Sequence, residues 1–524
     1  GNDIIDSLSA TNYKTKGRVT HYEQKKRNYL ADLSLFYNKE LKSINSKIDV
    51  LIGHTYQDFY SLVKNYASYG QDGKVIESTI PKFATDKPEF ALEGYLARTN
   101  ITINDKYLIT ASIRRDASSK FAPGNRVGYF PAVALAWKLK DELFKSSNLV
   151  SELKLRGGWG VTGQQDGIAY YSYLPVYNEG QGTAEYEFGD KYYSFVRPAA
   201  YDENIKWETT TTTNIGLDFG FLKNRITGSI DVYQKKTKDL LSIIPIAPGT
   251  NFDIQLLTNV GNLTNKGIEV TINTVPLKKK HFSWEFGFNV TYNDTKITNL
   301  LKYPDPKFPG IDVSSISGGT GNSIGKFAVG YAPYAFFVYK QVYDPQTGKA
   351  IEGLYEDINR DGKIDNSDKY LYKKPTADFL LGLNTTINYK KFSLGLAGHG
   401  MIGNYLYNNF ESNRAFLNSV QDPINFVANT SVNYSKTNFV NAQYFSDLYI
   451  ENASFFKLDN INLGLNLGSI VKPGTNLRLS ANVQNVLTIT KYSGYDPENS
   501  NQTGVDNNIY PRPRIYSIGA NFDF

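Results

Sequence analysis

The last eleven residues of the chain, Arg514–Phe524, alternate between apolar and polar side chains. Successive side chains of an extended strand point to opposite faces. One face would therefore carry Tyr516, Ile518, Ala520, Phe522 and Phe524, and the other Ile515, Ser517, Gly519, Asn521 and Asp523. A final strand that is apolar on one side and mostly small or polar on the other predicts an outer-membrane β-barrel. The edge strand of a soluble β-sandwich is the alternative.

The same alternation recurs along the whole chain. Examples are Asn476–Gln484, Asn460–Leu467, Tyr95–Ile103 and Ile226–Val232, and each is close to the ~9–11 residues that cross a bilayer at a tilt. About fifteen strands are predicted, all antiparallel in a barrel. They lie near residues 28–40, 46–60, 91–104, 106–116, 129–140, 151–162, 208–220, 224–238, 264–275, 281–296, 376–389, 391–404, 454–468, 476–489 and 514–524.

Composition excludes several classes of protein. Mean hydropathy is −0.39, and no apolar run approaches the ~18–20 residues of a membrane-spanning helix. Aromatic residues reach 14%, with 39 Tyr and 30 Phe, as expected for the aromatic girdles of a barrel. The net charge of +6 is small and scattered, so nucleic acid is not an expected partner. The absence of Cys excludes disulfides and thiolate metal sites.

The connections between the predicted strands alternate in length. Short turns are expected at 104–106, 221–224, 275–280, 389–391 and 468–475, and long loops near 61–90, 163–206, 239–263, 299–375, 405–451 and 490–513. Structureless loops of this length argue against a compact soluble domain. Short periplasmic turns and long extracellular loops are typical of outer-membrane barrels. Because bacterial barrels have an even number of strands, we expect at least one strand to precede Gly1.

A series of short segments resembles the SusC family of TonB-dependent transporters. In chain order they are Arg114–Phe121, Gly128–Val133, Leu155–Gln164, Lys206–Thr210, Asn214–Asp218, Asn265–Glu269, Tyr449–Leu458, Gln484–Val486, Gly494–Glu498 and Tyr510–Arg514. The resemblance implies a 22-stranded barrel in the bacterial outer membrane, of which residues 1–524 form the later part. It also implies a plug domain and first strands outside this sequence.

What the family does supplies further expectations. The resemblance implies import of oligosaccharides or oligopeptides, not an enzymatic reaction. It implies a SusD-like surface lipoprotein as a lid, and energy from the TonB–ExbB–ExbD complex acting through the plug. The N-terminal part of the same barrel and outer-membrane lipid would be the remaining partners.

One segment has the spacing of a calcium-binding loop. Asp357, Asn359 and Asp361 occupy positions 1, 3 and 5, Lys363 offers its carbonyl at position 7, and Asp368 closes the loop at position 12. Gly362 stands at position 6, where such a loop turns sharply. Ca²⁺ takes several hard oxygen ligands from a short bent segment. The sequence therefore predicts a structural calcium site in an extracellular loop, with a solvated turn as the alternative.

Four tyrosines in the long loop after Gly163 are candidate substrate contacts: Tyr170, Tyr171, Tyr173 and Tyr177. The four Trp residues are expected in girdles or packing. Gly321–Gly325 matches a nucleophile elbow around Ser323, but no helical pattern follows it, so no catalytic residue is predicted.

Two other functions remain open from the sequence. A passive outer-membrane porin would need neither a plug, a lipoprotein nor TonB. A soluble β-rich protein that binds or cleaves glycans would need paired carboxylates on facing strands to act as a glycosidase.

Overall fold

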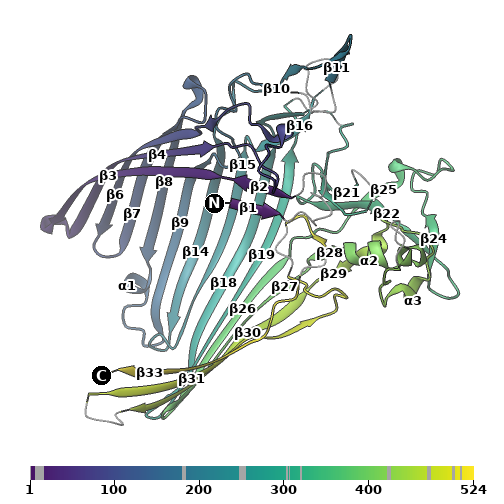
Figure 1. Ribbon diagram of the computed structural model, residues 1–524. Coiled ribbons are helices and arrows are strands. Elements are labelled where there is room, and N and C mark those ends of the chain that lie inside the picture. The colour runs from purple at the N-terminus through teal and green to yellow at the C-terminus, as the bar shows by residue number, and fades with distance from the viewer. Residues whose placement is uncertain are drawn as a thin grey trace. The chain divides into compact units, whose positions relative to one another are not determined.

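In the computed structural model, nearly all of the regular secondary structure is β-strand (Figure 1). The structure describes residues 2–5, 17–179, 185–246, 255–302, 305, 307–318, 322–421, 427–468, 474–498, 502–507 and 510–523. Phe524, the last residue of the predicted closing strand, and Gly321, the first of the elbow pattern, lie outside these residues. Within the described part, no helix is both long and apolar enough to cross a membrane.

One large antiparallel sheet contains every strand that the alternation predicts. Its neighbouring strands, in order, are β3 (Glu23–Leu41), β4 (Ser46–Lys64), β6 (Glu89–Ile103), β7 (Tyr107–Ser118), β8 (Val127–Lys138), β9 (Val150–Gln164), β14 (Glu208–Phe221), β15 (Ile226–Lys238), β18 (Asn262–Lys279), β19 (Phe282–Asn299), β26 (Phe379–Tyr389), β27 (Phe392–Ile402), β30 (Phe455–Gly468), β31 (Asn476–Thr490) and β33 (Ile515–Asp523). The short β5 (Thr85–Asp86) pairs with β4 beside this path. The strand prediction is confirmed, and the number of strands in the whole barrel stays a prediction.

Cross-strand register extends the alternation into rows across the sheet. The apolar row runs through Ile518, Ala481, Leu463, Leu394, Ile387 and Trp284. The adjacent row runs through Ser517, Asn482, Asn462, Gly395, Thr386 and Glu285. Apolar residues pair with apolar residues across each of these strands, so the strands share one apolar face and one polar face. The strands are β19, β26, β27, β30, β31 and β33.

The chain divides into two compact units. Unit 1 comprises Gly1–Ala134, Gly160–Thr210 and Asp239–Asn259, and unit 2 comprises Leu135–Trp159, Thr211–Lys238 and Val260–Phe524. Strands β8, β9 and β14 contribute residues to both.

The long connections of unit 2 fold into small sheets of their own. These contain β20 (Ile311–Ser315), β21 (Ser323–Phe327), β22 (Ala335–Tyr339), β23 (Gln341–Tyr343), β24 (Ala350–Tyr355), β25 (Lys369–Tyr372), β28 (Tyr405–Asn408), β29 (Ile450–Asn452) and β32 (Val505–Asp506). The expectation of structureless loops is therefore wrong for 299–375. Their own apolar residues give these connections a core, which offsets the conformational cost of ordering them.

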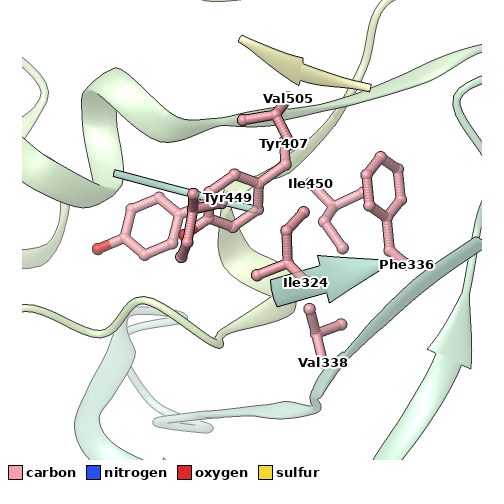
Figure 2. Close-up of a cluster of buried hydrophobic side chains, with 8 residues drawn as sticks. Ile324, Phe336, Val338, Tyr407, Tyr449, Ile450 and Val505 are labelled. Carbon is pink, nitrogen blue, oxygen red and sulfur yellow. The ribbon is translucent and has the colours of Figure 1, made fainter. Parts of the chain in front are cut away.

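Buried apolar side chains from these connections form one cluster. Figure 2 shows Ile324, Phe336, Val338, Tyr407, Tyr449, Ile450 and Val505 packed toward one another. Ile324, Phe336, Val338 and Tyr407 are fully buried. We call the connections that surround this cluster, 300–378, 404–454 and 491–514, the loop assembly.

The remaining elements of the described chain are short. In unit 1 the strands are β1 (Asn2–Ile5), β2 (Arg18–His21), β10 (Tyr177–Glu179), β11 (Glu185–Phe188), β12 (Lys191–Ser194), β13 (Val196–Pro198), β16 (Leu241–Pro245) and β17 (Gln255–Asn259). The α-helices are α1 (Lys140–Leu143), α2 (Asn409–Arg414) and α3 (Tyr434–Thr437). The 3₁₀ turns are η2 (Lys42–Ile44), η3 (Glu77–Thr79), η4 (Pro123–Asn125), η5 (Asn366–Asp368), η6 (Leu417–Val420) and η7 (Asp447–Tyr449).

One local expectation changes in the structure. The predicted turn 275–280 is mostly strand, because β18 continues to Lys279 and pairs with Phe282 across a tight turn. Ser323 begins β21 and pairs with Ser315, so the strand-to-helix geometry of a nucleophile elbow is absent around Ser323.

Candidate functional site

Charged side chains on the polar face of unit 2 pair across three neighbouring strands. Arg156 on β9 donates from Nε to Asp218 Oδ1 at 2.8 Å and from a terminal nitrogen to Asp231 Oδ2 at 2.8 Å. Lys154 lies 2.7 Å from the other oxygen of Asp218. All four side chains are mostly covered, with exposed fractions of 29% or less. The network fixes the pairing of β9, β14 and β15 on the face that would line a lumen.

Glycines make room for these polar side chains. A side chain on Gly216 would collide with Asp231 and with the Arg156 guanidinium, whose Cζ would lie 2.8 Å from its Cβ. A Cβ on Gly158 would lie 2.5 Å from Asn214 Oδ1. Two of the SusC-like segments, Leu155–Gln164 and Asn214–Asp218, are therefore complementary parts of one polar network.

Three more of these segments meet in a hydrophobic cluster of unit 1. Phe121, Phe130 and Trp207 are buried side by side, with ring centroids 5.1 Å and 5.5 Å from Trp207. The indole Nε1 of Trp207 donates to the Arg126 carbonyl at 2.9 Å. Trp207 therefore has a packing role, and this hydrogen bond satisfies the N–H group of its buried indole.

The four tyrosines predicted to contact substrate lie in different surroundings. Tyr170 and Tyr171 are about two-fifths exposed, and their rings lie 6.5 Å apart. Tyr170 also approaches Phe90, which stacks on Phe59 at 4.6 Å. The Lys120 ammonium lies 4.7 Å from the Phe90 ring centre. We call Phe59, Phe90, Lys120 and Tyr170 the aromatic platform; it was not predicted, because its members are dispersed in sequence.

The other two tyrosines have different surroundings. Tyr173 packs against the hydrophobic cluster of Phe121, Phe130 and Trp207. Tyr177 begins β10, pairs with Pro198 and is 69% exposed. A role in substrate contact stays a prediction for all four, and packing is an additional role for Tyr173.

The predicted calcium loop closes on itself through carboxylate oxygens. Asp357 accepts backbone N–H groups of Arg360, Asp361 and Gly362 at 2.6 to 3.2 Å. Gly362 has a φ of +82°, which supplies the predicted turn. The oxygens of Asn359 and Asp361 accept the backbone N–H groups two residues further on, which for Asp361 is the N–H of Lys363.

Asp368 is the buried end of the same loop. It is fully buried, and it accepts backbone N–H groups of Ile358, Asn359 and Asp365. The loop thus brings hard oxygen donors into one short segment, which is the donor chemistry of Ca²⁺. Among the described residues, no group of three or more His, Cys, Asp or Glu side chains is arranged to hold a metal ion. Calcium also takes Asn and carbonyl oxygens as ligands, and the calcium site stays a prediction.

A second charged cluster lies on the polar side of β27 and β30 in unit 2. Lys457, only 4% exposed, lies 2.7 Å from both Asp496 Oδ1 and Glu498 Oε2. Arg512 contacts Glu498 at 3.0 Å and Asp496 at 3.7 Å. We call these residues, with His399 and Asp459 beside them, the ion clamp.

The ion clamp was missed from the sequence although four of its six residues lie in SusC-like segments. Tyr449–Leu458 supplies Lys457, Gly494–Glu498 supplies both carboxylates, and Tyr510–Arg514 supplies Arg512. Asn485, from Gln484–Val486, adopts a φ of +53° and donates to the Arg512 carbonyl at 2.7 Å. The available signal was the occurrence of charged residues inside these segments.

A cavity of about 520 Å³ lies beside α2 in the loop assembly. Its walls carry the amides of Asn409, Asn413 and Asn418, and the rings of Phe410 and Phe416. Asn409 and Asn413 both donate to Ser317 Oγ, at 2.7 and 3.1 Å. Arg414 also lines the cavity. Amides, hydroxyls and a cation beside aromatic rings suit a polar ligand with hydroxyl, amide or anionic groups.

The large antiparallel sheet, with one apolar and one polar face, defines the class of outer-membrane β-barrel proteins. A family model described as "TonB dependent receptor-like, beta-barrel" matches residues 3–399. The chain belongs to this family of TonB-dependent receptor β-barrels, which lie in the bacterial outer membrane.

Individual relatives agree with this placement. The chain is 40% identical to the TonB-dependent receptor SusC of Bacteroides thetaiotaomicron, over 98% of this chain and 51% of SusC. It is 29% identical to the TonB-dependent receptor P3 of Formosa agariphila, over 97% of this chain and 53% of that receptor. The chain thus spans about half the length of these relatives.

A solved structure shares the fold. The RagAB peptide transporter matches with a TM-score of 0.76 and 21% identity, over 96% of this chain and 56% of that one. The predicted resemblance to SusC and the predicted barrel fold are confirmed.

Proposed function

We propose that this chain forms the barrel wall and extracellular loops of a SusC-type importer. The complete protein would move oligosaccharides or oligopeptides across the outer membrane, with no covalent step. The observation that carries this proposal is the 40% identity to SusC across 98% of the chain. A SusD-like lipoprotein would cover the loops, and the TonB–ExbB–ExbD complex would supply energy through a plug domain.

Two features of the chain support a solute path along its polar face. Amide and small side chains form rows across consecutive strands, including Asn482, Asn462 and Thr386. The amide-lined cavity beside α2 and the aromatic platform offer surfaces for polar ligands with some apolar area. Neither feature selects sugar over peptide, because amides pair equally well with hydroxyls and with peptide groups.

Uptake in living cells tests the proposal. The complete gene would be deleted from its bacterium, and uptake of labelled oligosaccharide and oligopeptide mixtures would be compared with the parent strain. We expect loss of uptake for at least one labelled class, and the same loss when TonB is deleted.

Purification of the native complex supplies a second readout. A SusD-like lipoprotein should co-purify with the full-length protein. Uptake that persists without TonB, together with passive solute flux through the purified protein in liposomes, would instead establish the porin alternative.

A further inference from the structure

A groove of about 420 Å³ is hollowed into the apolar face of unit 2, where β26, β27, β30 and β31 approach their short turns. Two cross-strand rows of side chains line it. One row contains Tyr389, Phe392, Leu465 and Leu479, and the other contains Ile387, Leu394, Leu463, Ala481 and Ile518. The apolar face of an outer-membrane barrel is in contact with lipid tails. The groove therefore opens toward acyl chains and not toward water.

Two aromatic residues and two lysines mark the end of this groove. Tyr389 and Phe392 are paired across the turn from β26 to β27, and Lys390 and Lys391 form that turn. The Lys390 ammonium lies 5.4 Å from the Tyr389 ring centre. Aromatic rings gather at the boundary between lipid tails and water, and long basic side chains reach from there into the water. A lipid tail in the groove would thus place its headgroup at Lys390 and Lys391.

The neighbouring turns on the same edge of the sheet carry the same sign of charge. The hairpins β14–β15, β18–β19 and β26–β27 are consecutive in the sheet, and they reverse at 222–225, 278–281 and 390–391. We call these three segments the basic turns. They contain no Asp or Glu and seven exposed basic residues, which are Lys223, Arg225, Lys278, Lys279, Lys280, Lys390 and Lys391. One sign of charge along one edge attracts anions.

Carboxylates of the chain do not neutralise the basic turns. Among the described residues, no ion pair involves any of these seven cations. Arg225 donates to the carbonyls of Val275 and Pro276, and Lys391 donates to that of Leu467, at 2.7 to 3.3 Å. Backbone carbonyls satisfy these donors but bring no negative charge. The counter-charge must therefore come from outside the described part of the chain.

The groove and the basic turns together identify the kind of anion. A soluble anion could occupy the basic turns, but it would leave the apolar groove unused. A phospholipid carries both a phosphate and acyl chains, and a juxtamembrane cluster of Lys and Arg favours anionic headgroups. The short turns of outer-membrane barrels face the periplasm, so the lipid would belong to the leaflet on that side.

We propose that the groove and the basic turns form a binding site for one anionic phospholipid of the periplasmic leaflet. Its phosphate lies at Lys390 and Lys391, and one acyl chain lies along the groove between Phe392 and Ile518. Lys278–Lys280, on the neighbouring hairpin, add to the attraction. The site holds a lipid against the wall and does not depend on which solute is transported.

Lipid titrations followed by native mass spectrometry test the proposal. The full-length protein in detergent would receive phosphatidylglycerol or phosphatidylcholine with identical acyl chains, so that only the headgroup differs. We expect the first phosphatidylglycerol to bind about tenfold more tightly than the first phosphatidylcholine. Equal affinity for the two lipids would overturn the proposal.

A pair of charge variants locates the headgroup. The double variant Lys390→Gln, Lys391→Gln should bind phosphatidylglycerol about tenfold more weakly and phosphatidylcholine as before. The control Lys235→Gln, Lys236→Gln removes the same charge from exposed positions at the other end of β15, and it should bind both lipids like the parent protein. An undiminished preference in the first variant, or an equal loss in the control, would overturn the assignment.

A third variant tests the groove. Ala481→Phe places a ring in the groove while keeping the face apolar, so it should weaken both lipids about equally. Unchanged affinity for both would show that the acyl chain does not lie there and would overturn the proposal. Heat-dependent migration on denaturing gels would verify that each variant barrel is folded.

Inorganic phosphate separates a lipid site from a site for free phosphate. A large excess of inorganic phosphate over lipid should leave phosphatidylglycerol bound, because phosphate alone gains nothing from the groove. Displacement of the lipid by inorganic phosphate would overturn the lipid assignment and leave an anion site at the basic turns.

Discussion

Arg156 on β9 and Asp218 on β14 form an ion pair 2.8 Å long that joins two SusC-like segments of the chain. Asp231 on β15 binds the same guanidinium, so a single side chain spans three neighbouring strands. Gly216 leaves the space that the guanidinium needs. Residues of two segments that indicate the family in the sequence are thus in direct contact in the β-sheet.

Removing the Arg156 side chain should destabilise the wall. Arg156→Ala leaves the carboxylates of Asp218 and Asp231 with Lys154 as their one remaining ion-pair partner among the described residues, and we expect a loss of about 1–3 kcal/mol in unfolding free energy. Arg156→Lys should restore only part, because an ammonium lacks the planar fork that reaches two carboxylates. Urea unfolding of the refolded barrel would measure both variants, and equal stability of all three proteins would contradict this role.

A charge on the apolar face of β31 or β33 should impair assembly. Leu479→Lys or Ile518→Lys places an ammonium on the apolar face, at a cost of about 2–4 kcal/mol near the bilayer centre. Ser480→Asn and Ser517→Asn lie on the polar face and should assemble normally. The folded fraction in outer membranes, read from heat-dependent gel migration, checks the prediction. Equal effects on both faces would contradict the assignment of faces.

The tyrosines after Gly163 should separate into two classes. Tyr170→Ala removes a ring of the aromatic platform and should weaken substrate binding roughly threefold to tenfold, without loss of stability. Tyr173→Ala opens the hydrophobic cluster around Trp207 and should cost about 1–3 kcal/mol of stability. Binding and thermal unfolding would be measured with a solute identified by uptake. A stability loss confined to Tyr170→Ala would reverse the assignment.

Calcium removal should loosen the segment Asp357–Asp368 without unfolding the barrel. A bound ion would offset the repulsion among the carboxylates of Asp357, Asp361, Asp365 and Asp368. Protease cleavage within this segment should increase with chelator, and Asp357→Ala should give the same cleavage without it. Asp344→Ala is a matched control for Asp357→Ala. The Asp344 carboxylate also caps a turn, accepting the backbone N–H groups of Gln346 and Thr347, but it lies outside the predicted calcium loop. Identical cleavage with and without chelator would leave the segment a solvated turn.

The loop assembly should lose stability at high pH through its buried and half-buried tyrosines. Burial raises the pKa of Tyr355 to about 12, and nearby Tyr339 and Asp447 add to the shift. Burial also raises the pKa of Tyr370 and Tyr449 above the usual value. A raised pKa means that the neutral phenol stabilises the fold below pH 10, and that this stabilisation is lost as pH rises toward 12.

Near-UV circular dichroism from pH 9 to pH 12 would follow this loss. Tyr355→Phe removes one titrating group and its hydrogen bond to Gln443, so its stability should fall less steeply with pH than that of the parent. An identical pH profile for the variant would exclude Tyr355 as a contributor.

The strand positions could be predicted from the sequence because alternation is a local property. A strand such as β31 shows its two faces in consecutive residues, Leu479 and Ser480, and no distant partner is needed to recognise it. The turn 275–280 was misplaced because the strands continue past the last clear alternation, and only pairing between Lys279 and Phe282 sets their end. The segments that resemble SusC identified the family without revealing what each segment contacts.

The contacts of the candidate sites were decided by tertiary structure. Phe59, Phe90 and Tyr170 come from separate connections and strands, and so do His399, Asp459 and Glu498. Nothing local distinguishes a histidine that faces two carboxylates from one that faces water. By itself the sequence determined a barrel of alternating strands and its family, because side-chain periodicity and the family's segments can be recognised in consecutive residues. Which charges meet was decided only by strand register and loop packing, because electrostatic and aromatic contacts act over a few ångströms in space.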